Sequence, residues 1–227
     1  MTSNSQKMIL LCNSNPRKLK ELALQRARDM NEKCLIYSFG SSGDFSFEAS
    51  LATLLEGAPC EVHVFDMDDF ARLIPAKYKD FIFFHQWGLK GSREQSQFMA
   101  LQSIREPTKY QSSQILSASS PEAQIGEFHT FQEIVKKLGH KNRIIDVLKI
   151  DCEGCEWDTY EDWLQSSVDI RQIQVEMHYV HKHAVHFFLI LQRAGFVTFH
   201  KEANTLVNGL CYEYAFMKLD EAFFADS

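Results

Sequence analysis

Apolar residues follow a helical spacing near the start of the chain and then fall into short alternating blocks. Positions 19, 22, 23, 27 and 30 are apolar and come after Asn15-Pro16, which predicts a helix over about 19–30. Further along, β-rich runs predict strands at 34–39, 61–66, 81–89, 146–151, 170–180, 196–200 and 211–219. Helical runs predict helices at about 47–55, 69–74, 130–139, 157–164 and 183–194. This alternation predicts an α/β fold, with a parallel sheet covered by helices and a hairpin-like pair at the end.

Residues 91–128 interrupt this alternation of predicted strands and helices. They are rich in Ser and Gln, contain Pro107 and Pro121, and show no sustained apolar period, so we predict an insertion or a lid. We expect residues 1–33 to form an N-terminal helical extension and residues 34–227 to form one main domain.

Two short signals mark the ends of predicted elements. Thr130 followed by Glu133 is a capping-box pattern, which predicts that a helix begins there. Asn208-Gly209 lies between the last two strands and predicts a tight turn.

The composition limits the classes of partner. The chain has 227 residues, 45% of them apolar, and this is enough for one domain with a sizeable core. Its formal net charge of −6 disfavours binding to nucleic acid or to an anionic membrane. No apolar stretch is long enough to span a bilayer. The six cysteines are scattered, so we expect reduced thiols and a cytoplasmic protein.

The stretch YSFGSSGDFSFE, residues 37–48, places a glycine turn at the end of the first predicted strand. Gly40 and Gly43 can adopt a positive φ, so the N–H groups of the turn can approach a ligand closely. Asp44 or Ser46 would cap the helix that follows. The stretch lacks the Gly-Lys-Ser/Thr of a triphosphate-binding loop and a complete G-x-G-x-x-G. A tight strand-to-helix turn also needs glycine for purely structural reasons, and this alternative stays open.

Asp66 ends the second predicted strand, 23 residues after Gly43. Nucleoside-binding folds place at this point the carboxylate that binds both ribose hydroxyls. Asp68 and Asp69 follow it and are expected to cap the next helix instead. The glycine turn and Asp66 together indicate a ligand that contains a nucleoside.

The stretch LKIDCEGCEW, residues 148–157, ends another predicted strand with three acids, Asp151, Glu153 and Glu156. Like charges this close together are unfavourable unless a cation or a hydrogen-bond donor offsets them. A cationic ligand, a metal ion or proton transfer would each explain them. The alternative is that Asp151 and Glu153 cap the helix that follows.

These stretches, together with VHVFD, resemble class I S-adenosylmethionine-dependent methyltransferases, and more narrowly the methyltransferase-like protein 24 group related to FkbM-type enzymes. The matching positions are Ser46, Phe47, Glu48, Lys149, Asp151, Glu153, Gly154, Glu156 and Trp157. The resemblance implies a Rossmann-like, seven-stranded, mostly parallel sheet with an antiparallel final strand and helices on both faces. Cys152 and Cys155 stand where that group has small apolar residues, so we interpret them as two buried hydrophobic side chains.

The resemblance also implies how S-adenosyl-L-methionine, the methyl donor, binds. Its methionine part would lie against the glycine turn, its ribose on Asp66, and its adenine near Met67 and Trp87-Gly88. Asp151 would face the methionyl ammonium or the substrate. The residues assigned to the donor are Gly40, Ser41, Ser42, Gly43, Asp44, Ser46, Asp66, Met67, Trp87, Gly88 and Asp151.

The expected reaction is methylation of a hydroxyl group on a small molecule or a glycan, and such an acceptor needs a base. His178 is the leading candidate because its reference pKa of about 6.5 lies close to neutral pH. Glu153, Glu156 and Glu176 are competing bases or substrate anchors. We assign no metal, although a divalent ion held by Asp151, Glu153 and His178 stays an open alternative.

Two other classes of function also stay open. A methyltransferase-like binding module would keep the fold and bind ligand without turnover. A nicotinamide-dependent oxidoreductase would fit the glycine turn and Asp66, but it would leave the acids of LKIDCEGCEW unexplained.

Overall fold

The computed structural model describes residues 16–92, 126–178, 182–204 and 211–220. Its centre is a seven-stranded sheet with the order β10-β11-β9-β7-β1-β2-β3. The strands are β1 (Cys34–Phe39), β2 (Cys60–Phe65), β3 (Ile82–His85), β7 (Val147–Ile150), β9 (Gln172–His178), β10 (Phe196–Ala203) and β11 (Cys211–Lys218). β11 runs antiparallel to β9 and β10, and the other neighbouring strands are parallel. The predicted Rossmann-like sheet with an antiparallel final strand is confirmed.

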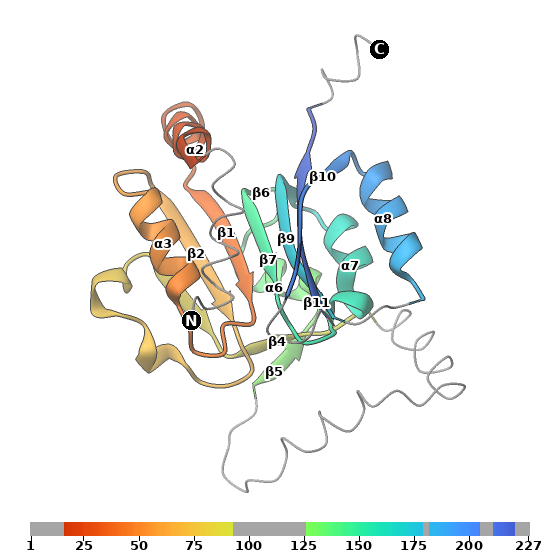
Figure 1. Cartoon of the computed structure of the whole chain (residues 1–227). Coiled ribbons are helices and arrows are strands. Elements are labelled where there is room, and N and C mark those ends of the chain that lie inside the picture. The colour runs from red at the N-terminus through yellow and green to blue at the C-terminus, as the bar shows by residue number, and fades with distance from the viewer. Residues whose placement is uncertain (1–15, 93–125, 179–181, 205–210, 221–227) are drawn as a thin grey trace, which may run out of the picture.

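Helices lie on both faces of this sheet (Figure 1). They are α2 (Pro16–Met30), α3 (Ser46–Leu54), α6 (Phe131–Lys137), α7 (Glu156–Leu164) and α8 (Ala184–Arg193). α3 contributes Phe47 and Leu51 to a core shared with β1 and β2. α6, α7 and α8 contribute Phe131, Trp163 and Phe187 to a second core shared with β7 and β9. No helix in the described ranges is long and apolar enough to cross a membrane.

The capping box predicted at the start of α6 is confirmed. The Thr130 hydroxyl accepts a hydrogen bond from Glu133 N at 3.3 Å, and the Glu133 carboxylate accepts one from Thr130 N at 2.8 Å. Two N–H groups that a helix start leaves without partners are thereby satisfied.

The prediction of a helix near residues 69–74 is wrong. Two short 3₁₀ turns, η1 (Ala71–Leu73) and η2 (Ala76–Tyr78), stand in its place. The reason is Pro75, because a proline disfavours the helical conformation of the residue before it. Ile74 accordingly adopts an extended backbone, with ψ of 121°.

The long predicted strands at 81–89 and 170–180 are each divided. The first divides into β3 and β4 (Trp87–Leu89), and β4 pairs with β5 (Glu127–His129) in a separate two-stranded sheet. The second begins as β8 (Asp169–Ile170), which pairs with β6 (Ile144–Ile145), before β9 joins the main sheet. Most of the predicted insertion and the whole Asn208-Gly209 turn lie outside the described residues, and the division of the chain at residue 33 stays a prediction.

The expectation of reduced thiols is wrong for four of the cysteines, which form the disulfides Cys34–Cys60 and Cys152–Cys155. Cys34 and Cys60 begin β1 and β2 and are register partners, with Cα atoms 4.4 Å apart. Sequence spacing alone does not reveal that register. The cysteines therefore give no support to a reducing compartment.

α2 is fixed to the sheet by one buried ion pair. Arg26 donates to both carboxylate oxygens of Asp146, at 2.6 and 2.8 Å, and Leu35 N donates to the same carboxylate at 3.0 Å. The Arg26 side chain is 10% exposed and that of Asp146 is 4% exposed. Two parallel hydrogen bonds of this kind give a geometrically specific contact between α2 and the strand that precedes the site.

We predict that Arg26→Met lowers the free energy of unfolding by about 3 kcal/mol, because it leaves the buried charge of Asp146 without its partner. Urea denaturation followed by circular dichroism would measure this. Arg28→Met, which changes an exposed arginine of the same helix, is the control and should cost less than about 0.5 kcal/mol. Equal effects of the two substitutions would contradict the importance assigned to this ion pair.

Candidate functional site

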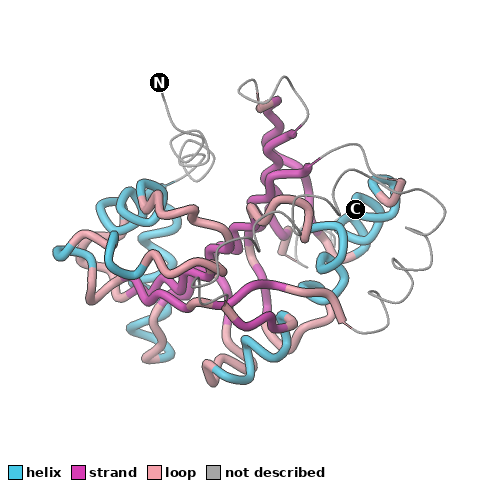
Figure 2. The backbone as a smooth tube through the Cα atoms, turned by 90° about the horizontal axis from the view of Figure 1, so that it is seen from below, coloured by secondary structure: helices cyan, strands magenta, loops and turns pink. Residues whose placement is uncertain are grey.

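A cavity of about 320 Å³ opens at the carboxyl ends of β1, β2 and β7. β1 lies between β2 and β7 in the sheet. After β1 the chain continues to β2 on one side, and after β7 it continues to β9 on the other side, so the strand order reverses between β1 and β7. Ligands of open α/β sheets bind at such a switch point. Figure 2 views the molecule from below, onto this edge of the sheet.

Gly40 forms the floor of the turn after β1. Its φ is +76°, and a Cβ there would lie 1.6 Å from the carbonyl oxygen of Asp151. No side chain fits in that space, so glycine is required for the backbone to pass. Lys149 Nζ donates to the carbonyl of Gly40 at 2.7 Å and holds the turn from inside the sheet.

Asp66 ties this turn to the end of β2. Its Oδ2 accepts hydrogen bonds from Ser41 N at 2.8 Å, from Ser41 Oγ at 3.0 Å and from Ser42 N at 2.9 Å. Its Oδ1 has one longer contact, with Asp68 N at 3.3 Å. The carboxylate therefore organises the turn, and Oδ1 is the oxygen best placed to accept from a ligand hydroxyl. Binding of both ribose hydroxyls by Asp66 stays a prediction.

The structure brings most of the residues predicted for the donor to this cavity. It is lined by Gly40, Ser42, Asp66, Met67, Trp87, Gly88 and Asp151. Trp87 stacks on His85 and Phe65, with ring centroids 4.8 and 6.2 Å apart, and forms an aromatic wall. At Gly88 a Cβ would lie 2.8 Å from the ring of Phe128, so a larger residue would require that side chain to shift.

The other four predicted donor residues, Ser41, Gly43, Asp44 and Ser46, shape the turn from outside the cavity lining. Gly43 has a φ of +76°, a left-handed conformation that favours glycine, so it shapes the turn as predicted. The predicted capping of α3 by Asp44 or Ser46 is wrong, since no side chain caps that helix. Asp44 instead accepts from Ser46 N at 2.9 Å and forms a local turn ahead of the helix.

Lys149 and Glu48 are buried neighbours of the glycine turn, and the sequence predicts no role for either. Both are buried beneath the glycine turn, at 4% and 1% exposure. Ser38 Oγ donates to Glu48 at 2.6 Å, and burial, partly offset by the charge of Lys149, raises the pKa of Glu48. A lysine inside the apolar strand VLKI was the available signal, because lysine is almost never fully buried without a partner.

Glu156 and His178 form a buried pair behind the cavity. Glu156 Oε1 accepts from His178 N at 2.7 Å and lies 3.1 Å from His178 Nδ1. Its other oxygen accepts from Gly154 N at 2.9 Å. Trp157 Nε1 in turn donates to the carbonyl of His178 at 2.7 Å. The start of α7 is thereby fixed to the end of β9, and Glu156 is fully occupied as an acceptor.

Glu153 lies on the cavity side of His178, 3.3 Å from its Nε2, and is the one predicted catalytic residue that lines the cavity. Burial lowers the pKa of His178, but Glu153 and Glu156 outweigh burial and raise that pKa well above its usual range. His178 is therefore an imidazolium at neutral pH, so the reason for predicting it as the base, a pKa close to 7, does not hold. Asp151, Glu153 and His178 do bring ligand atoms within 4.8 Å of one another. A metal ion there would first have to displace the proton of His178.

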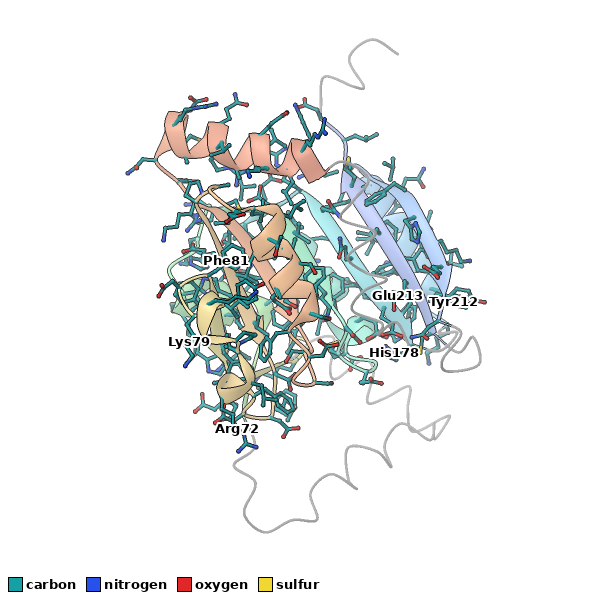
Figure 3. All side chains as sticks on the ribbon, turned by 60° about the vertical axis from the view of Figure 1, so that its left-hand side comes forward. Arg72, Lys79, Phe81, His178, Tyr212 and Glu213 are labelled. Carbon is teal, nitrogen blue, oxygen red and sulfur yellow. A yellow bond between two sulfur atoms is a disulfide. The ribbon has the colours of Figure 1, made fainter. Side chains whose placement is uncertain are left out.

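Asp151, Glu176 and Glu213 form a row of acids across β7, β9 and β11. Glu213 is the register partner of Glu176, and Asp151 follows Ile150, whose partner Val175 precedes Glu176. Glu176 accepts from Asn204 at 2.7 Å and hydrogen-bonds to Asp151. Figure 3 shows Glu213 and His178 at the same end of the sheet.

Burial is the main cause of raised pKa values at Glu176 and Glu213. Burial and the charge of Asp151 raise the pKa of Glu176, and burial, Glu176 and Asp151 raise the pKa of Glu213 to about 8. Within the part of the chain that the structure describes, Oε2 of Glu213 is buried without a hydrogen-bond partner. Sequence reasoning missed Glu213 because it stands between Tyr212 and Tyr214, where the alternation indicates a solvent-facing position.

A family model described as a methyltransferase domain matches residues 11–218. No curated protein sequence matches the chain.

Several solved structures are similar in fold. A 1,6-didemethyltoxoflavin-N1-methyltransferase from Burkholderia thailandensis has 10% identity and a TM-score of 0.41, with 91% of this chain and 80% of that chain covered. The 16S rRNA methylase ArmA has 11% identity and a TM-score of 0.38, with 96% and 100% covered. Magnesium protoporphyrin IX methyltransferase from Synechocystis PCC 6803 has 13% identity and a TM-score of 0.36, with 96% and 86% covered. At these identities and TM-scores, the substrates of these enzymes are not assigned to this chain.

The raised pKa of Glu213 predicts that the free energy of unfolding depends on pH. The carboxyl has an ordinary pKa of 4.5 and a folded-state pKa of about 8, so the folded protein keeps it neutral where the unfolded chain ionises it. Its contribution to the free energy of unfolding is therefore intact below pH 4.5, falls as the pH rises above that value, and is lost once the pH has passed through 8. Relative to the parent, Glu213→Gln should therefore be more stable at pH 8 than it is at pH 5, by on the order of 3 kcal/mol in the free energy of unfolding. Urea denaturation of both proteins at both pH values would measure this difference. Glu56→Gln, at an exposed position, is the control. A difference between Glu213→Gln and parent that does not change with pH would contradict the neutral state.

Proposed function

Because the chain belongs to the methyltransferase-domain family, we propose that it transfers a methyl group from S-adenosyl-L-methionine to a hydroxyl group of a small molecule or a glycan. The observation that carries this proposal is the cavity at the switch point, which joins the Gly40 turn, the carboxylate of Asp66 and the aromatic wall at Trp87. The narrower membership in the methyltransferase-like protein 24 group and the cytoplasmic location stay predictions.

The residues present fit this donor. The cavity volume of about 320 Å³ lies within the range of small-molecule sites, roughly 300–1,000 Å³. Gly40 admits a ligand close to the backbone, Asp66 Oδ1 can accept from a ribose hydroxyl, and Trp87 offers an apolar face to a base. When bound, S-adenosylmethionine supplies a methyl group on an electrophilic sulfonium.

Asp151 is the residue best placed to take the proton of the acceptor hydroxyl. It lines the cavity, and its hydrogen bond to Glu176 links it to a carboxyl whose pKa is raised. A carboxylate within hydrogen-bond reach of an acceptor hydroxyl can act as a general base, and a neighbouring carboxyl with a raised pKa can hold Asp151 in place by donating a hydrogen bond to it. His178 has the different role of holding Glu153 at the cavity rim through its positive charge.

The charge of the cavity supports an acceptor other than nucleic acid. Asp151 and Glu153 both line it, and the whole chain has a formal net charge of −6. Carboxylates at this position would repel a phosphate backbone. An uncharged hydroxyl compound or a glycan meets no such repulsion.

A second candidate is a binding module without turnover. It is favoured by the protonated state of His178, which removes the imidazole base from the site. Transfer of a labelled methyl group to a library of small molecules and glycans separates the two functions, since the module would bind donor and transfer nothing. Isothermal titration calorimetry with S-adenosylhomocysteine, compared with NAD, tests the donor itself, and tighter binding of NAD would exclude the methyltransferase proposal.

We predict that Asp66→Asn weakens S-adenosylhomocysteine binding by about 10- to 100-fold in calorimetry, because an amide supports the Ser41 and Ser42 N–H groups less well and removes the charged acceptor for a ribose hydroxyl. Asp68→Asn changes the exposed neighbouring acid and should leave the affinity within about twofold. Unaltered affinity in Asp66→Asn would contradict the assigned donor site.

Asp151→Asn should lower the turnover number by about 100-fold or more once an acceptor is found, since general base catalysis contributes a factor of about 10² to 10⁴. Donor affinity, measured by calorimetry on the same preparation, should change much less. Turnover close to that of the parent would rule out Asp151 as the base.

A further inference from the structure

Glu61, His63 and His140 form a second cluster, the Glu61 cluster, away from the cavity. Each of the three offers a ligand atom within 4.8 Å of those of the other two. Glu61 and His63 lie on β2, two residues apart, and His140 lies in the turn that follows α6. None of the three lines the cavity, and the proposed methyl transfer uses none of them.

His63 carries an unsatisfied nitrogen into this cluster. The residue is only 7% exposed, and its Nε2 is buried without a hydrogen-bond partner among the described residues. A buried polar atom without a partner costs about 1–3 kcal/mol, so its position calls for an explanation. Its other nitrogen, Nδ1, lies 2.9 Å from His85 Nε2. The two nitrogens of an imidazole point away from each other, so Nε2 faces away from His85.

His140 is held in the same way. Its Nδ1 lies 2.7 Å from the hydroxyl of Tyr37, which is completely buried. Its Nε2 lies 3.9 Å from Glu61 Oε1. Both histidines thus have one nitrogen in contact with a neighbouring side chain, which leaves the other nitrogen as a candidate metal ligand. Histidines that bind metal ions have this arrangement, because the outer partner fixes the ring orientation.

Glu61 completes the cluster and connects it to solvent. Its Oε1 accepts from Arg143 at 3.1 Å, and no described residue donates to its Oε2. Arg143 balances the charge of Glu61 and also donates to the carbonyl of Lys33 at 2.8 Å. The Glu61 side chain is 16% exposed, so an ion can enter from that side. Arg143 occupies Oε1, the oxygen that lies 3.9 Å from His140 Nε2, so a bound ion would either share Oε1 with Arg143 or take Oε2.

We propose that the Glu61 cluster is a Zn²⁺ site, with imidazole nitrogens of His63 and His140 and one oxygen of Glu61 as ligands. Two imidazoles and one carboxylate suit a borderline ion such as Zn²⁺, whereas Mg²⁺ and Ca²⁺ prefer oxygen ligands. The ion would satisfy the buried Nε2 of His63. It would also link β2 to the segment after α6, and a water molecule would take the fourth position.

Metal binding by the full chain, stripped with a chelator, tests this proposal. Isothermal titration calorimetry with Zn²⁺ alone should show one ion per chain, and X-ray absorption of the zinc-loaded protein should show imidazole ligands. His63→Gln and His140→Gln should each weaken Zn²⁺ binding by at least about 10-fold. Tyr37→Phe keeps the packing and removes only the hydroxyl that holds His140, and it should weaken binding by about 10- to 100-fold.

Two control variants locate the ion. His200→Gln changes a histidine at the edge strand β10, with a side chain that is 37% exposed, and should leave Zn²⁺ affinity unchanged. Asp151→Asn changes a potential ligand at the cavity and should also leave it unchanged. Failure to bind Zn²⁺, loss of binding in Asp151→Asn, or full binding in both His63→Gln and Tyr37→Phe would each overturn the proposal. All these measurements detect Zn²⁺ binding and not methyl transfer, so failure of the zinc proposal is distinguishable from failure of the proposed function.

Discussion

The site depends on one close backbone contact, that of Gly40 with the carbonyl of Asp151. The two residues follow β1 and β7, which part at the switch point of the sheet, and a Cβ on Gly40 would lie 1.6 Å from that carbonyl oxygen. The contact fixes the path of the turn, and Lys149 and Asp66 then hold the turn from below and from the side. The cavity has its shape because these three restraints act on one loop.

Several ionisable groups are buried beneath this loop and along the neighbouring strands β9 and β11. Lys149, Glu48, Glu176 and Glu213 are all less than 5% exposed. Burial of a charge is unfavourable unless it is paired or neutralised. The fold meets this constraint in two ways, by pairing Lys149 with the Gly40 carbonyl and by raising the pKa of Glu213 so that it stays neutral. The acid that reaches the cavity, Asp151, therefore lies at the end of a row whose other two carboxyls, Glu176 and Glu213, have raised pKa values.

Histidines in this protein show how strongly environment decides chemistry. His178 lies between two carboxylates, Glu153 and Glu156, and they keep it positively charged. His63 and His140 lie among aromatic and imidazole rings, with one nitrogen of each held by a neighbour. The first arrangement suits an electrostatic anchor, and the second suits a metal ligand. Residue type alone distinguishes none of these roles.

The sequence by itself determined the α/β sheet, the order of most elements, the capping box at Thr130 and the segments that line the cavity. Those features follow from local periodicity, turn chemistry and strand ends, which neighbouring residues specify. Only the tertiary structure decided the protonation of His178, the burial of Glu213 and the grouping of Glu61, His63 and His140. Each of these depends on which residues face one another across strands and on how much water is excluded there, and these are long-range properties that no local pattern encodes. The Cys34–Cys60 disulfide is another such case, because it depends on the register between β1 and β2.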